Sequence, residues 1–208
     1  METKTQKWTL NVLGLFFIFF GTFSMDYAIW RTKPEWALWI CYVAMILIGF
    51  GILFRLPSLI ASQLTIVGIP LTIWNIDFFY QFIVRQPLWN VTDYFFGEML
   101  PASRFISLEH FFLIPLGLYA LWRIKLNTNK FWIASVTQVT ILYLLTFFFS
   151  RPTENVSCIF YSCISFIPDG RWYPLTWFGL MFAMIGIVSI IINSIFLFHS
   201  RSLNNRNT

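Results

Sequence analysis

The chain has 208 residues, of which 58% are hydrophobic and 21% aromatic, while only 11% carry a charge. Soluble globular domains average about 25% charged residues, so this composition excludes an ordinary soluble enzyme and indicates a membrane protein. The net charge of +5 comes without a basic run, so no nucleic-acid partner is expected and the expected partners are membrane lipids.

Six apolar stretches follow one another along the chain. Five of them lack Asp, Glu, Lys and Arg for at least 18 residues, and the fourth in order, 105–122, is interrupted by Glu109 and His110. A helix of about 20 apolar residues crosses a bilayer with its backbone groups bonded internally. We therefore predict an all-α polytopic membrane protein, in which residues 1–208 form a single transmembrane domain, a six-helix bundle. The predicted helices cover about 8–30, 36–54, 57–82, 104–123, 130–149 and 174–199.

The basic residues indicate how the bundle lies in the membrane. With the N-terminus in the cytoplasm, the inner segments hold eight of the fourteen basic residues and one acid, Glu2. Loops rich in Lys and Arg stay in the cytoplasm, so we predict a multi-pass protein of the cell membrane with both termini inside. The first helix is expected to remain in the protein, because no small-residue cleavage site follows it.

Two longer loops, 83–103 and 150–173, then face outward. Each carries an Asn-x-Ser/Thr sequon, at Asn90 and at Asn155, which permits glycosylation. Cys158 and Cys163 lie in the second loop, and an external loop favours a disulfide between them. Cys41 lies within the second predicted helix, where a cysteine is usually a small apolar residue.

The polar residues inside the predicted helices lie toward the outer side. Asp77 is near the outer end of the third helix, and Ser107, Glu109 and His110 occupy the first two turns of the fourth. One charge at mid-span costs about 2.5 to 3.5 kcal/mol, so we expect these groups to be functional and Asp77 to face His110 across an outward-facing pocket. The sequence places the two histidines on opposite sides of the membrane without a clustered ligand set, so no cofactor or metal is expected.

Three classes of function fit these residues. A membrane-embedded hydrolase or lipid-modifying enzyme would use His110 as general acid or base, oriented by Asp77 or Glu109, with Ser107 or Cys41 as nucleophile. A small transporter or proton-coupled carrier would use the same ionisable groups as ion sites, and needs a polar lining that continues to the inner side. A non-catalytic assembly or scaffold protein would use the same residues to hold helices together. Polar groups such as Asn75 and Gln138 would then act only as interhelical hydrogen bonds, which average about 0.6 kcal/mol.

Three short motifs lie between about 65 and 160: Trp74-Asn75-Ile76-Asp77, Ser107-Leu108-Glu109-His110 and Pro152-Thr153-Glu154-Asn155. In this region the chain resembles an uncharacterised group of prokaryotic multi-span membrane proteins with a Trp-Asn-x-Asp helix, a Ser-Leu-x-His helix and a Pro-x-x-Asn loop. The resemblance implies a polytopic fold and carries no known activity.

A second resemblance rests on His110 followed five residues later by Pro115, after an aromatic third-helix region around Pro70. In these features the chain is similar to the androgen-induced family of multi-span lipid hydrolases, in which a threonine nucleophile and a histidine act inside the membrane. The resemblance implies that His110 takes part in lipid hydrolysis. The second helix begins with Trp36-Ala37-Leu38-Trp39-Ile40-Cys41 and has no counterpart of the threonine, so Cys41 would have to take its place.

Overall fold

The computed structural model describes residues 3–164 and 167–204, with side chains as far as residue 196. The regular structure of these residues is entirely helical, and five of the helices are long and apolar enough to cross a membrane, with α2 as a shorter apolar helix. The predicted fold class, an all-α polytopic bundle, is therefore confirmed. The principal helices are α1 (Lys4–Trp30), α2 (Ile40–Leu53), α3 (Pro57–Val84), α5 (Pro101–Ser107) with α6 (Glu109–Ile124), α7 (Phe131–Phe149) and α8 (Tyr173–Asn204).

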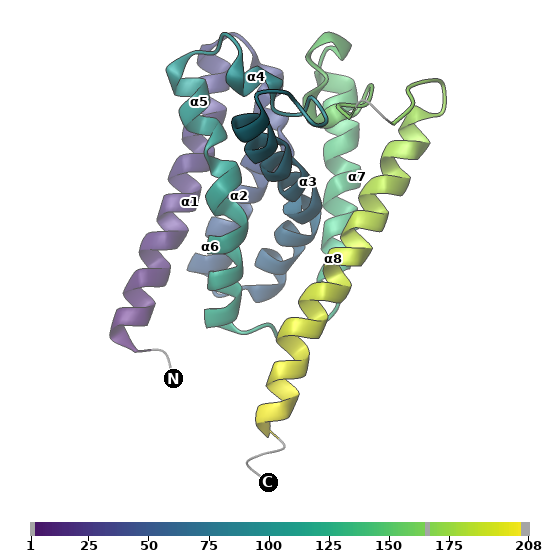
Figure 1. Ribbon diagram of the computed structural model, residues 1–208. Helices are drawn as coiled ribbons and strands as arrows, with labels where there is room; N and C mark the ends of the chain where they lie inside the picture. The colour runs from purple at the N-terminus through teal and green to yellow at the C-terminus, as the bar shows by residue number, and fades with distance from the viewer. Residues whose placement is uncertain (1–2, 165–166, 205–208) are drawn as a thin grey trace.

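Short helices occupy the connections at one end of the bundle. They are η1 (Pro34–Leu38), α4 (Asp93–Phe96), η2 (Pro152–Glu154) and η3 (Val156–Cys158). Figure 1 shows α4, α5 and the loop after α7 gathered at this end, whereas α1 begins and α8 ends at the opposite end. The prediction that both termini are cytoplasmic concerns residues 1–2 and 205–208, which lie outside the described residues, and the orientation of the bundle stays a prediction.

Two predicted helices are divided in the structure. The helix expected over 36–54 is split at Trp39, whose φ of −56° and ψ of 126° are not helical, into η1 and α2. The helix expected over 104–123 begins earlier, at Pro101, and is divided at Leu108 into α5 and α6. Hydrogen bonds from Leu108 N–H to Phe105 O and from Phe111 N–H to Leu108 O tighten the backbone there.

The helices α1 and α2 approach each other closely at glycines. A Cβ added to Gly49 would lie 2.6 Å from Cγ1 of Ile18 and 2.7 Å from the carbonyl oxygen of Gly14. Small residues that bring backbones together are typical of helix contacts in membranes, where packing rather than water exclusion holds helices together. This contact fixes α2, which carries Cys41, against α1.

A polar layer connects α3 and α7 away from the loop-rich end. The side-chain amides of Gln63 and Gln138 bond reciprocally, with Nε2 to Oε1 distances of 2.7 and 2.8 Å. Thr65 Oγ1 and Ser135 Oγ lie 2.7 Å apart. The interpretation of Gln138 as an interhelical hydrogen-bonding group is therefore confirmed.

Candidate functional site

Three reactive side chains gather where α2 and α6 begin. Cys41 is in the first turn of α2, and Glu109 and His110 open α6. One ligand atom from each of the three, the Cys41 sulfur, a Glu109 carboxylate oxygen and a His110 ring nitrogen, all lie within 4.8 Å of one another. We call Cys41, Glu109 and His110 the α2–α6 cluster. The expectation that the chain has no clustered ligand set is wrong, because the fold brings Cys41 to the histidine.

The carboxylate of Glu109 is the most constrained member of the α2–α6 cluster. Its side chain has no exposed surface and, apart from the weakly donating thiol of Cys41, neither oxygen has a hydrogen-bond partner among the described residues. Its Oε1 lies 3.9 Å from Nδ1 of His110, which is beyond hydrogen-bond distance. A buried carboxylate without a partner costs free energy on the order of several kcal/mol, so a group of this kind is seldom retained for packing alone.

His110 is held in a defined orientation. Its Nδ1 lies 2.8 Å from the carbonyl oxygen of Ser107, and because a carbonyl can only accept, Nδ1 is the donor. The ring stacks on Trp74 of α3 with centroids 4.4 Å apart and planes inclined by 21°. The His110 carbonyl accepts a hydrogen bond of 2.8 Å from Nδ2 of Asn75, also on α3. The neutral ring therefore has its lone pair on Nε2, the nitrogen that can accept a proton or bind a metal.

Ser107, a predicted nucleophile, has a different place. Its side chain is 7% exposed and its Oγ donates a hydrogen bond of 3.1 Å to the carbonyl of Ser103 in the same helix. Ser107 acts on the α2–α6 cluster through its backbone carbonyl, which orients His110. Among the described contacts, Cys41 is thus the nucleophilic side chain that the fold places with His110 and Glu109.

Asp77 does not form the predicted pair with His110. Its Oδ1 accepts hydrogen bonds from the backbone N–H groups of Leu88 at 3.0 Å and Trp89 at 2.7 Å. Its Oδ2 accepts from the N–H of Thr92 at 2.8 Å and from the Thr92 hydroxyl at 2.7 Å. The expectation that Asp77 and His110 face one another is wrong, because four donors of the following loop satisfy the carboxylate.

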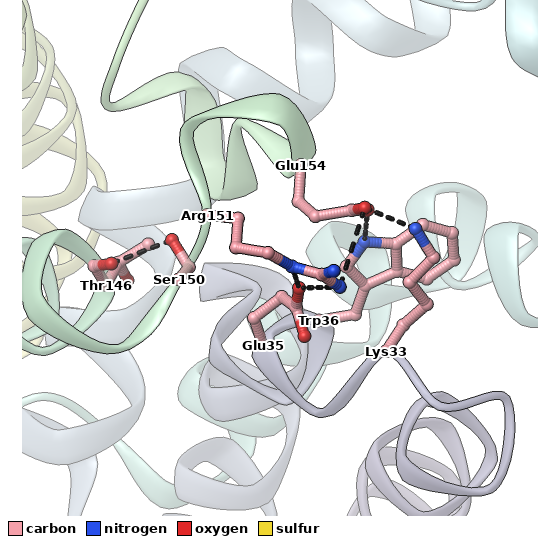
Figure 2. Close-up of polar contacts among 7 residues, drawn as sticks. All are labelled: Lys33, Glu35, Trp36, Thr146, Ser150, Arg151 and Glu154. Atoms are coloured by element: carbon pink, nitrogen blue, oxygen red, sulfur yellow. Dashed lines mark hydrogen bonds and ion pairs between the residues drawn. The ribbon is translucent and has the colours of Figure 1, made fainter.

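A group of charged residues outside the spans fixes the beginning of α2 (Figure 2). Glu35 Oε1 accepts hydrogen bonds from Nε and Nη2 of Arg151 at 2.8 and 2.6 Å. Glu154 pairs with Lys33 and accepts a hydrogen bond of 2.8 Å from the indole Nε1 of Trp36. We call these five residues the loop clasp, because they join the loop before α2 to the loop after α7.

The electrostatics of the loop clasp favour charged carboxylates. Hydrogen bonding to Lys33 is the largest influence on the pKa of Glu154, which lies below its ordinary value although partial burial acts in the opposite direction. Burial raises the pKa of Glu35, but hydrogen bonds from its backbone and from Arg151 together outweigh it, so this pKa is also lowered. Both acids are therefore anionic at neutral pH and hold the two loops together.

The loop after α7 is bonded to the bundle as well. Cys158 and Cys163 form a disulfide, with Cα atoms 5.7 Å apart. Ile40 directly precedes Cys41, and its backbone N–H donates a hydrogen bond of 3.2 Å to Oγ of Ser157. The phenol of Tyr173 donates a bond of 2.7 Å to the carbonyl of Cys158. The loop thus spans the beginnings of α2 and α8.

The sequence named Cys41 only as one of two candidate nucleophiles and did not place it beside Glu109 and His110. A signal was present, because Cys41, Glu109 and His110 all stand within the first turn of a helix that begins at the loop-rich end, and so lie at similar depth. A thiol, an imidazole and a carboxylate together can act in nucleophilic catalysis or bind a transition metal. No family model, curated protein or solved structure matches this chain.

Proposed function

We propose that this membrane protein is an embedded enzyme that acts on a lipid or another membrane-soluble substrate at the α2–α6 cluster. The observation that carries the proposal is the meeting of Cys41, Glu109 and His110 within 4.8 Å, from two helices that are far apart in the sequence. Interhelical packing needs no such combination, since the Gln63 and Gln138 amides join α3 and α7 with neutral groups.

His110 is the proposed general acid and base. Its Nδ1 is held by the Ser107 carbonyl, which leaves Nε2 for proton transfer. The His110 side chain is 13% exposed, whereas that of Glu109 is fully buried, so we propose that substrate approaches past the imidazole. In this proposal Asp77 anchors the loop after α3. Ser107 orients the histidine through its carbonyl.

The proposal is tested by lipid turnover in a defined bilayer. The purified full chain is placed in nanodiscs of mixed bacterial phospholipids and glycolipids, and the lipid species are followed by mass spectrometry. We expect one species to be consumed by the unaltered protein, and His110→Ala to slow its loss by roughly 100-fold or more, as general acid–base catalysis typically contributes.

Two controls separate catalysis from folding. Glu98→Gln removes an exposed carboxylate of the loop before α5 and should leave turnover unchanged. Each variant is compared with the parent chain by size-exclusion profile and thermal unfolding. Turnover that survives His110→Ala and Cys41→Ser in folded protein contradicts the proposal. If no lipid changes but vesicles show proton-coupled solute uptake, and His110→Ala abolishes this uptake, the carrier is favoured. If neither lipid change nor uptake is found, the scaffold is favoured.

A further inference from the structure

We infer that the α2–α6 cluster binds one zinc-type divalent ion through the Cys41 thiolate, the Glu109 carboxylate and the His110 imidazole. The inference rests on the proposed function for the role of such an ion, but binding is a separate property that is measured without a substrate. The three ligand atoms already lie within 4.8 Å of one another. Around a tetrahedral zinc, with bonds of about 2.0 to 2.3 Å, ligand atoms are about 3.3 to 3.8 Å apart. Closing that difference needs the ligand atoms to move by about 1 Å.

The unpartnered carboxylate is independent evidence for a cation. Glu109 is fully buried and, apart from the weakly donating thiol of Cys41, its oxygens have no hydrogen-bond partner in the described part of the chain. Asp77, by contrast, has four hydrogen bonds from its own loop. The fold therefore can supply hydrogen-bond donors to a buried acid. Among the described residues it supplies none of this kind to Glu109, which lies beside a sulfur and a nitrogen ligand. A bound cation supplies the missing partner.

The surroundings of His110 match those of a metal ligand. Metal-binding histidines commonly donate the second ring N–H to a backbone carbonyl, which fixes the ring and its tautomer. Here Nδ1 donates to the Ser107 carbonyl, and the ring stacks on Trp74. The nitrogen with a free lone pair is then Nε2. Binding through it requires the ring to turn, because Nδ1 is the nitrogen that lies 3.9 Å from Oε1 of Glu109.

The ligand types select the class of ion. Magnesium and calcium prefer oxygen ligands, whereas a thiolate with an imidazole and one carboxylate suits zinc. Three protein ligands leave the fourth tetrahedral position open, which is the arrangement of catalytic rather than structural zinc. When bound, such an ion would occupy Nε2 of His110, so the polarised water that it supplies, rather than the imidazole, would serve as acid and base at this site, where the His110 side chain is 13% exposed.

Cobalt is the probe for this site, because Co²⁺ replaces zinc and a Co²⁺–thiolate bond has an intense charge-transfer absorption. The chain has three cysteines, and with Cys158 and Cys163 joined in a disulfide, Cys41 is the single free thiol. The full chain is purified in detergent without reductant, treated with chelator, counted for free thiols and titrated with Co²⁺. We expect one ion per chain by elemental analysis, a charge-transfer band, and displacement of cobalt by Zn²⁺.

The variants assign the ligands. Cys41→Ser should abolish the charge-transfer band. Glu109→Gln should weaken Co²⁺ binding by at least about tenfold, because mutation of residues around a metal site typically lowers metal affinity by that factor or more. Glu98→Gln is the matched control and should bind normally. A parent chain with one free thiol that shows no charge-transfer band, or a band that persists in Cys41→Ser, overturns the inference, and the parent measurement decides this even where a variant fails to fold.

The two proposals fail in different ways. Lipid turnover that depends on Cys41 and His110, in a chain that binds no Co²⁺, would overturn the metal site and leave the enzyme. Stoichiometric Co²⁺ binding at Cys41 without any lipid turnover would support the metal site and count against the enzyme.

Discussion

Because α1 and α2 are in close contact at Gly49, we predict that Gly49→Ala destabilises the fold. In Gly49→Ala the new Cβ would lie 2.7 Å from the carbonyl oxygen of Gly14, whereas ordinary contacts begin at 3.4 Å. The carbonyl belongs to the backbone and cannot rotate away, so the helices must separate by about 0.7 Å at this point, the difference between those distances. Overpacking of this kind typically costs about 1 to 3 kcal/mol. We therefore expect a lower free energy of unfolding.

The matched control is Gly186→Ala in α8, where an added Cβ would meet no atom of another described helix within 4 Å. Alanine favours a helix over glycine by up to about 1 kcal/mol, so this variant should be as stable as the parent or more so. Unfolding is measured by steric trapping in bicelles, which reports free energy without denaturant. Equal stability of the two variants would refute the argument that the α1–α2 contact is limited by backbone approach.

Three further results are expected. Because the folded pKa values of Glu35 and Glu154 lie below their ordinary value of 4.5, the loop clasp should stabilise the fold above that pH and lose its contribution as the pH falls through the lowered pKa values. Glu154→Gln should reduce this acid-induced drop in melting temperature, and an unchanged pH profile would count against the clasp. Asp77→Asn should speed amide hydrogen exchange within 88–92, where the aspartate now accepts three backbone bonds, while exchange in α7 serves as the unaffected reference. In intact cells an impermeant thiol reagent should label cysteines introduced at 88–92 and not at 126–129, and the reverse pattern would invert the predicted topology.

The fold was predictable because length and hydrophobicity decide which segments cross a membrane. The breaks at Trp39 and Leu108 were not, since neither stands at a glycine or proline and both depend on local backbone bonds. Depth could be counted along a helix, which placed Glu109 and His110 correctly near one end. The side of the helix that each residue faces could not be predicted in this way, because it depends on how the helices pack.

Asp77 illustrates the limit for the candidate site. An acid near the end of a membrane helix can be satisfied by another helix or by its own following loop, and the loop donors here are backbone amides that no sequence pattern marks. Cys41 illustrates the converse. A lone cysteine in an apolar helix gives no signal of its own, and its meaning appears only when α6 brings Glu109 and His110 beside it.

The bonds between Asp77 and its loop would also limit when a glycan could be added at Asn90. Asn90 is exposed, but Thr92 of the same sequon is completely buried, and its hydroxyl points to Asp77 and Gln81. An oligosaccharyltransferase must hold that hydroxyl while it modifies the asparagine, so the loop cannot be a substrate once it has closed. A glycan at Asn90 would therefore record that the enzyme reached the nascent segment before α3 and its loop came together.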